Sequence, residues 1–472
     1  MNPDRLWLRF VRLSLLCALV PGFSLATLMV SAWLFGQSPG LWYLAAIQTH
    51  AFALLTGWGG AMILGVALHF LPRLRGVKLV RPEWVARLFW LLAIGLTCRI
   101  VGQPLLALLV PTGPRAAVAW LNAVIAVGAV LSALAVVGLL AVLITTFRAG
   151  PPLGKNHGFK QIAPLLMVAA LALSLAQLVW AWGAAASLVQ GRSLAVFPAG
   201  VQELAVDLML FGFIAAIGVA MSSRLFPLTF RIKLPQPRAL RIAGGLLAGG
   251  VLCTAIAGLQ PAFALTGLSL GNWAAVFYAG GLLVGVFAVR IFQTRKPILH
   301  AVVPYRITED PAAVGVLSAY IWVVVGAGLL LLLPLQAAGV PIPGPLLQKN
   351  LARHAIGLGF MTLLIMSVGW KMLPGFGGGQ PRGRGLVWSA VSLANLAVLL
   401  RILPALFPSG NGPGRSWSEL LFPCAGMAAL AAILAFAIAL QLSFRKPAKP
   451  GDHGSRADPT ERKTLGQAPR HS

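Results

Sequence analysis

The chain of 472 residues has few acidic side chains: Asp and Glu together number 10, against 37 Lys and Arg. Charged residues of both signs make up only 10% of the sequence, whereas hydrophobic residues make up 58% and the mean hydropathy is +0.85. A soluble domain carries far more charge than this. The composition therefore excludes a soluble globular protein and indicates a polytopic membrane protein.

Cysteine is also scarce. The four cysteines, Cys17, Cys98, Cys253 and Cys424, stand singly in apolar segments, and no CxxC pair occurs. This spacing excludes a disulfide framework and a thiolate metal site. The sequence also lacks an HExxH motif and any Ser-His-Asp or Cys-His arrangement of a nucleophilic enzyme.

Long hydrophobic runs, in contrast, are abundant. Runs of about 20 apolar residues predict membrane-spanning helices, because lipid offers no partner to backbone polar groups and no run alternates like a barrel strand. We expect an all-α polytopic membrane domain over 1–444 and a disordered, polar, Pro- and Gly-rich tail over 445–472. The predicted spans are 11–36, 44–72, 84–110, 117–147, 161–190, 201–227, 240–262, 271–292, 313–337, 352–374, 385–407 and 419–443.

The basic residues are placed asymmetrically around these spans. Cytoplasmic loops of membrane proteins are enriched in Lys and Arg, so the richer side is expected to be cytoplasmic and to hold both termini. The sequence thus predicts a membrane protein whose positive charge reflects topology and contact with the lipid bilayer, not nucleic-acid binding. Only seven of the 37 basic residues fall on the other side: Arg99, Arg115, Arg192, Lys349, Arg353, Arg401 and Arg415.

Three of the runs share one pattern. A glycine stands fifteen residues before a proline, and a basic or basic-capable side chain stands three residues before that proline. The pattern predicts three sequential four-helix units, about 1–148, 149–298 and 299–444, whose second, sixth and tenth spans are equivalent. The three sets are Gly57, His69 and Pro72; Gly212, Arg224 and Pro227; and Gly359, Lys371 and Pro374.

Two histidines lie near the outer ends of equivalent spans. His50 precedes Gly57 by seven residues and His354 precedes Gly359 by five, so their depths differ by roughly 3 Å at the α-helical rise. Two such imidazoles can bind one haem from both faces; the alternative is that each hydrogen-bonds a neighbouring carbonyl. His69 lies at the opposite end, in a slot that the other units fill with Arg or Lys, and we expect it to be structural.

Three arginines, Arg99, Arg353 and Arg401, fall near the same outer face as the two histidines. Guanidinium groups hold carboxylates through paired hydrogen bonds, so these residues are candidates to bind haem propionates. The alternative for each is a side chain that snorkels from a helix end.

Two acidic residues, Glu203 and Asp207, lie well inside the spans and four residues apart on one helical face. Asp207 precedes its anchor glycine by five residues, the position that His354 takes in the third unit. Intramembrane carboxylates are costly and mark functional sites. These two are candidate metal ligands or proton-relay groups, or they pair with an arginine.

The histidine-bearing segments resemble two helices of subunit I of the haem-copper oxidases. "THAFALLTGWGGAMILGVALHFLP" resembles that family's second helix and "RHAIGLGFMTLLIMSVGWKMLP" its tenth. The resemblance implies a twelve-helix bundle in which His50 and His354 ligate a low-spin b-type haem. Ala352 stands where the family has a further histidine, and spans six and seven contain none. The usual ligands of the oxygen-reducing haem and of copper are therefore missing.

A second resemblance is to the NnrS family of haem- and copper-containing membrane proteins, which are linked to nitric oxide stress. It is carried by "HAF…G…P", "SSRLFPLTFR" and "HAIGLGFMTLLIMSV" in that order. The resemblance implies electron transfer or a nitric oxide response, with an electron-donor protein, a quinol or nitric oxide as partner. Gln48, Thr49 and "PGFGGG" depart from the family pattern and put its copper in doubt. The alternatives are a haem-free multi-pass transporter and an oxidase-derived assembly factor.

Overall fold

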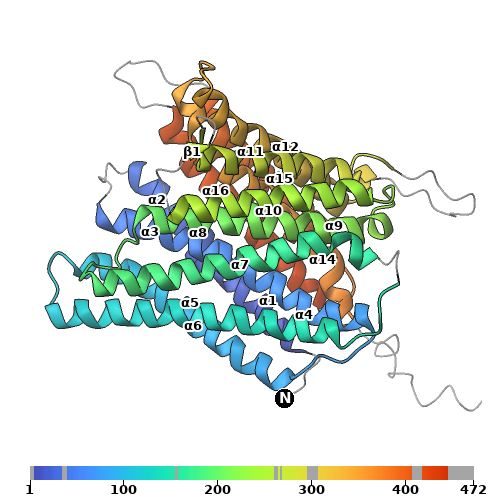
Figure 1. The fold of residues 1–472 in the computed structure, drawn as a ribbon, viewed down its shortest axis with the longest axis horizontal. Helices are drawn as coiled ribbons and strands as arrows, with labels where there is room; N and C mark the ends of the chain where they lie inside the picture. Colours follow the sequence, from blue (N-terminus) through green and yellow to red (C-terminus); the bar gives the residue numbers. More distant parts are fainter. Residues whose placement is uncertain are drawn as a thin grey trace, which may run out of the picture.

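The computed structural model describes residues 5–34, 40–154, 158–259, 264–265, 268–294, 307–406 and 417–444. In this part of the chain, twelve helices are long and apolar enough to cross a membrane, as the sequence predicts. Figure 1 shows that they run side by side in one bundle. The predicted disordered tail, 445–472, lies outside the described residues.

The twelve spans follow the predicted limits to within a few residues. The first begins at Leu6 instead of residue 11, because the arginines of its first turns lie at the end of the bundle and do not interrupt the helix. In chain order the spans are Leu6–Ala32, Leu41–Arg75, Pro82–Leu109, Arg115–Arg148, Gly158–Val189, Ala199–Thr229, Pro237–Gly258, Leu270–Val289, Pro311–Ala337, Lys349–Phe376, Arg384–Ala405 and Leu421–Phe444.

Several spans are composed of more than one helical element. The first four contain α1 (Leu6–Cys17), η2 (Ala18–Ser24), α2 (Leu25–Leu34), α3 (Leu41–Phe52), η3 (Ala53–Ala61), α4 (Met62–Arg75), α5 (Pro82–Leu109) and α6 (Arg115–Arg148). The next four contain α7 (Gly158–Val189), α8 (Ala199–Asp207), η4 (Leu208–Ile214), α9 (Ala215–Thr229), α10 (Pro237–Leu259) and α11 (Leu270–Val289), with the two-residue strands β1 (Ala264–Leu265) and β2 (Leu268–Ser269) before α11. The last four contain α12 (Pro311–Ala337), α13 (Lys349–His354), η7 (Ala355–Thr362), α14 (Leu363–Phe376), α15 (Arg384–Leu406) and α16 (Trp417–Phe444), with the short 3₁₀ turns η5 (Ile307–Glu309) and η6 (Gly344–Leu347) in the loops.

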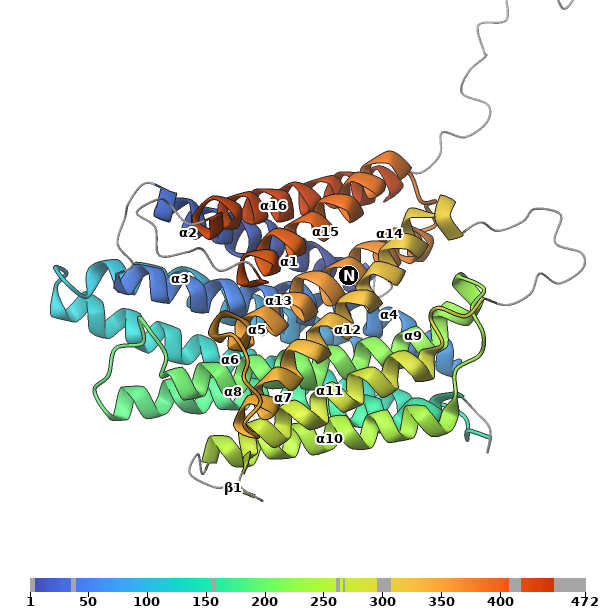
Figure 2. The ribbon, with the colours of Figure 1, turned by 90° about the horizontal axis from the view of Figure 1, so that it is seen from above.

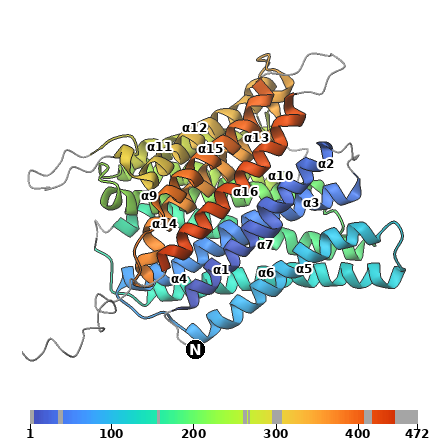
Figure 3. The same ribbon diagram turned by 180° about the vertical axis from the view of Figure 1, so that it is seen from behind.

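The second, sixth and tenth spans form the centre of the bundle. Their most apolar stretches are 72, 83 and 61% buried, more than those of the other nine spans. Their middle segments, η3, η4 and η7, contact one another. The other described spans enclose them in a ring, in the order first, third, fourth, fifth, seventh, eighth, ninth, eleventh and twelfth. The ring closes where α16 packs against α2, which Figures 2 and 3 show as the red and dark blue helices.

Each central span contains a π-helical segment at the same point. η3, η4 and η7 each begin four residues before the glycine that the sequence pattern singles out, namely Gly57, Gly212 and Gly359. A π-helical turn inserts an extra residue and redirects the side chains that follow it, and such turns are frequent at functional sites. Asp207 and His354 are the last residues before η4 and η7, so they occupy matching places on two central helices.

The three glycines allow close helix packing. A Cβ at Gly57 would lie 2.6 Å from the Cβ of Cys17, one at Gly212 would lie 2.6 Å from that of Ala172, and one at Gly359 would lie 2.6 Å from that of Trp322. These partners lie on the first, fifth and ninth spans. Each central helix is therefore in contact with the span that precedes it in the chain, at a separation that only a residue without a side chain permits.

The two ends of the described chain lie at the same end of the bundle. The ring of Trp7, in α1, lies 6.1 Å from that of Phe444, the last residue of α16. An even number of spans requires this arrangement. The site described below lies at the opposite end, where α3, α8 and α13 begin.

Candidate functional site

Two histidines of the central helices, His50 and His354, border one cavity. It has a volume of about 280 Å³ and is bounded by the first, second, sixth, tenth, eleventh and twelfth spans. His50 and His354 both line it, together with Glu203, Arg353 and Arg401. The fold therefore brings five of the seven residues predicted from the sequence to one place. The rest of the wall is mainly apolar and includes Phe23, Leu54, Leu210, Met361 and Phe422.

The two imidazoles are held in the same way. The Nδ1 atom of His50 lies 2.9 Å from the carbonyl oxygen of Gly22, and that of His354 lies 2.8 Å from the carbonyl oxygen of Asn350. A carbonyl oxygen can only accept, so Nδ1 carries the proton in both rings. Nε2 is then left with a free lone pair. Histidines that bind metals are oriented in this manner, with the other ring nitrogen donating to a carbonyl or carboxylate.

Of the two arrangements that the sequence left as alternatives, the structure contains the hydrogen bond to a neighbouring carbonyl. Each histidine hydrogen-bonds a neighbouring carbonyl, and that bond uses only one ring nitrogen. Both rings are half-buried and border the cavity. The carbonyl bond is compatible with a ligand role for Nε2 and fixes the tautomer that such a role requires.

A cation lies beside the two imidazoles. Arg401, on α15, lines the cavity and interacts electrostatically with both His50 and His354. The centre of its guanidinium group lies 4.3 Å from the centroid of the Phe422 ring, a cation–π contact. Tyr43, on the same wall, lies within the electrostatic range of Arg401. The guanidinium is thus in position to receive an anionic group at the edge of the cavity.

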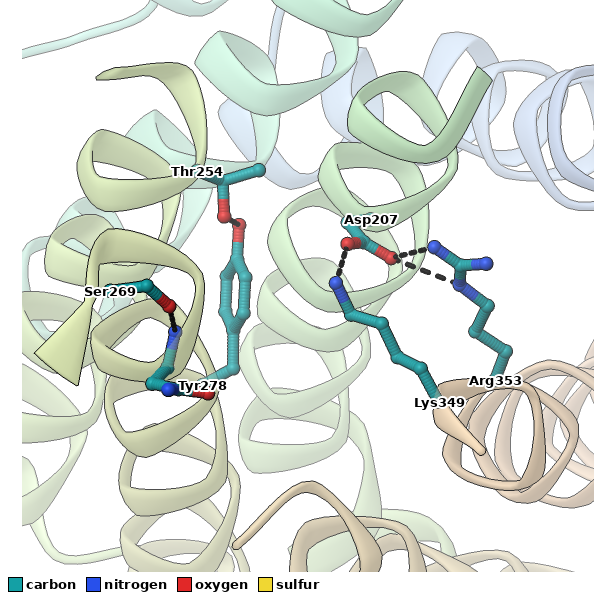
Figure 4. A network of polar contacts seen from close by, with 7 residues as sticks. Asp207, Thr254, Ser269, Tyr278, Lys349 and Arg353 are labelled. Atoms are coloured by element: carbon teal, nitrogen blue, oxygen red, sulfur yellow. Dashed lines mark hydrogen bonds and ion pairs between the residues drawn. The ribbon is translucent and has the colours of Figure 1, made fainter. Parts of the chain in front are cut away.

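Asp207 forms ion pairs with two cations of the tenth span. Arg353 donates to one oxygen of the carboxylate from Nε at 3.0 Å and from Nη2 at 2.8 Å, and Lys349 donates to the other oxygen. Figure 4 shows both side chains reaching from α13 toward the carboxylate on α8. Of the three roles predicted for Asp207, pairing with an arginine is the one present. The cluster joins the sixth and tenth spans directly beside His354.

Glu203 lies one turn before Asp207 and has different surroundings. Its side chain is exposed and lines the cavity. Among the described residues no group of three or more His, Cys, Asp or Glu side chains is close enough to hold a metal ion. The two carboxylates and the two histidines therefore do not converge on a common metal centre in the described part of the chain.

Arg99 lies outside the cavity wall, in an aromatic enclosure of its own. Its side chain is fully buried, and the guanidinium lies 4.2 Å from the ring centroids of Phe52 and Phe197 and 5.0 Å from that of Trp180. Nη2 donates to Oε1 of Gln202 at 3.0 Å, whereas Nη1 has no hydrogen-bond partner among the described residues. Because Gln202 also lines the cavity, Arg99 contacts its wall from behind.

The glutamines of this enclosure were not singled out by the sequence. Gln48 accepts from the backbone N–H of Phe197 and donates to its carbonyl oxygen, at 2.8 and 2.9 Å. Gln103 donates to Gln48 at 2.8 Å and accepts from Arg99. These bonds fix the loop between the fifth and sixth spans against the helix that carries His50. The sequence does contain a signal for Gln48. An amide inside a membrane span is unusual, and in "QTH" it stands two residues before the candidate ligand His50.

His69 lies at the other end of the second span and has structural contacts. Its ring stacks on Phe376 with centroids 4.1 Å apart and meets the ring of Trp7 edge-on at 5.2 Å. Arg73 donates from Nη1 to Nδ1 of His69 at 3.1 Å. The Nδ1 atom is therefore an acceptor, the reverse of its state in His50. These contacts agree with the structural role predicted for this position.

The cavity combines metal-ligating nitrogen atoms with a mainly apolar wall. The imidazoles offer two nitrogen lone pairs from two central helices, and Arg401 supplies a positive charge. Imidazole pairs of this kind are axial ligands of haem iron. The donors present are thus of the kind that would hold a haem.

Comparisons with known proteins return no relative. No family model matches the chain, and no curated protein matches it in sequence. The function of the site is therefore inferred from its own residues.

Proposed function

We propose that this protein is an integral membrane haem protein that binds one b-type haem between His50 and His354. The observation that carries the proposal is the pair of imidazoles bordering one cavity, each with Nδ1 bonded to a carbonyl oxygen so that Nε2 is free to ligate. Neither nitrogen has another role in the described structure.

A haem in this cavity would supply one-electron redox chemistry. The protein's own residues would set the conditions for it. His50 and His354 would hold the iron from two central helices, Arg401 would bind an anionic group of the haem, and the mainly apolar wall would limit access of water. Arg353 lines the same cavity while it pairs with Asp207. If both histidines held the iron, the site would favour electron transfer over direct chemistry on a gas.

The architecture supports a bundle like that of haem-copper oxidase subunit I. Three regularities recur in the units 1–148, 149–298 and 299–444: the central span lies second, its π-helical segment begins four residues before a glycine, and that glycine packs against the unit's first span. We infer three four-helix pseudo-repeats from these features. The resemblance to the NnrS family supports a bacterial inner membrane as the location, an electron donor or quinol as partner, and a role in the response to nitric oxide. The asymmetry of Lys and Arg supports cytoplasmic termini.

The proposal assigns no ligands to copper. The described residues contain no cluster of His, Cys, Asp and Glu that would supply its ligands, and the carboxylate of Asp207 is already bonded to Lys349 and Arg353. The proposal likewise assigns no catalytic residue.

An optical spectrum tests the proposal. The full-length chain, purified in detergent from haem-sufficient cells, is expected to show a low-spin b-type spectrum on reduction with dithionite. His50→Ala and His354→Ala should each lose the low-spin form. His69→Ala is the matched control, because that histidine lies on the same helix as His50 but is packed against Phe376; it should retain the spectrum.

Folded wild-type protein without a haem spectrum would refute the proposal. It would favour a transporter in which Glu203 and the two histidines line a polar path, and flux through reconstituted vesicles would then separate this from an assembly factor.

A further inference from the structure

A second cavity lies among the three central helices, on the side of the π-helical segments away from the histidines. It has a volume of about 160 Å³, and all its lining residues come from the second, sixth and tenth spans. Eight of the twenty lining residues are buried and the other twelve are partly exposed, so the cavity is partly open. Neither histidine lines it.

The wall of this cavity is almost entirely apolar. Four methionines, Met62, Met221, Met361 and Met372, contribute to it, and their polarizable thioethers adapt to small guests and interact well by dispersion. The one hydroxyl side chain is that of Ser222, which is 1% exposed. Its Oγ faces the hydroxyl of Tyr320 without reaching hydrogen-bond geometry, so it has no partner among the described residues.

We propose that this central cavity binds one small neutral apolar molecule, of the size of a dissolved gas or a single hydrocarbon ring. The size argues for it, because a dry apolar cavity of about 150 Å³ in another protein binds benzene and xenon. The chemistry argues against other guests. A water molecule needs two to four polar partners, and the wall offers one hydroxyl. An ion would lose its hydration without compensation.

The two cavities share one side chain. Met361, in η7, lines both of them. Its sulfur atom lies 2.7 Å from the position that a Cβ at Gly59 would take. The thioether therefore forms part of the partition between the central cavity and the space beside the histidines. A gas held in the central cavity would be one flexible side chain away from the histidine cavity. This link rests on the proposed haem function, whereas the binding of a small molecule does not.

Xenon tests the binding directly, because it requires neither haem nor hydrogen bonds. Crystals of the full-length protein under xenon pressure are expected to show an anomalous peak between the second, sixth and tenth spans. Ala67→Leu should abolish that peak, because Ala67 lines the cavity and leucine adds three carbon atoms. Ala141→Leu is the matched control: Ala141 is exposed on α6 and lines neither cavity, so xenon should still bind.

The absence of xenon from the wild-type cavity would overturn the proposal, and so would density for an ordered water chain or a lipid tail in its place. The wild-type result decides the question even if Ala67→Leu fails to fold. The same measurement on His50→Ala separates the two proposals. Xenon bound in a haem-free chain supports the cavity alone, and a haem spectrum without xenon supports the haem site alone.

Discussion

Asp207 is the buried charge on which the geometry around His354 depends. It bonds both Lys349 and Arg353 from across the interface between the sixth and tenth spans, and only 6% of its side chain is exposed. Without the carboxylate, two cations of one short helix would face each other with no anion between them. The position of α13, and with it that of His354, then loses its ion pairs to the sixth span.

Asp207→Asn is therefore expected to destabilise the fold and to change the redox properties of the site. The loss of charge-assisted bonds costs about 2 kcal/mol in the free energy of unfolding, since both partners keep some access to solvent. The midpoint potential of a bound haem should rise, because removing a negative charge favours the reduced form. Thermal unfolding in detergent and a spectroscopic redox titration measure the two effects. Glu83→Gln, at an exposed helix start, is the control and should change neither.

Arg401 should have the opposite effect on the potential. Arg401→Gln removes a positive charge that acts on both imidazoles, so the midpoint potential of a bound haem is expected to fall. Haem retention should weaken about tenfold, as expected for one charge-assisted hydrogen bond to a propionate. Titration of haem into the haem-depleted protein measures the affinity. Arg115→Gln changes an exposed arginine at the start of α6 and serves as the control. Equal effects of the two variants would remove Arg401 from the site.

The sequence predicts that the two histidines and Arg401 lie at similar depth, because equivalent helices place equivalent positions at equal depth. The structure places all three on the wall of one cavity. It did not separate Arg99 from them. Depth along a helix does not reveal which face a side chain takes, and Arg99 faces the aromatic rings of Phe52, Trp180 and Phe197 instead of the cavity. The partner Lys349 follows from spacing once Asp207 is placed, because it precedes Arg353 by one helical turn.

Whole helices were more predictable than their internal geometry. The twelve spans follow from the length of the apolar runs, which lipid thickness sets directly. The π-helical segments have no comparable signal: η2 contains Pro21, whose missing N–H disrupts the α-helical ladder, but η3, η4 and η7 contain no proline. Their common position relative to a glycine emerges only when the three central helices are compared.

The close approach at these glycines predicts opposite results for two alanine substitutions. Gly212→Ala would place a Cβ 2.6 Å from the Cβ of Ala172 and force two helices apart, at a cost of about 1–3 kcal/mol. Gly245→Ala, on the exposed face of α10, meets no atom within 4 Å and should stabilise the helix by up to about 1 kcal/mol. Thermal unfolding of both variants in the same detergent provides the measurement. A Gly212→Ala protein as stable as the wild type would contradict the packing.

The arrangement of nine spans around three explains why the sites lie where they do. Outer helices meet lipid and tolerate only apolar surfaces, whereas the central helices meet protein on most sides and can carry charge. His50, Asp207 and His354 are all on central helices, and Arg401 reaches inward from the ring. The first and last spans, which close the ring, also contribute to the wall of the histidine cavity. An incomplete chain that lacks either of them would leave that cavity open.

The orientation of the whole bundle is the last prediction. The excess of Lys and Arg at the end that holds Trp7 and Phe444 favours that end as the cytoplasmic one. In a chain whose four cysteines are replaced, Lys78→Cys and Arg192→Cys place single exposed thiols at opposite ends of the bundle. A membrane-impermeant thiol reagent should label Arg192→Cys in intact spheroplasts and Lys78→Cys only after lysis. The reverse pattern would place the histidine cavity on the cytoplasmic side and would require an electron donor from that compartment.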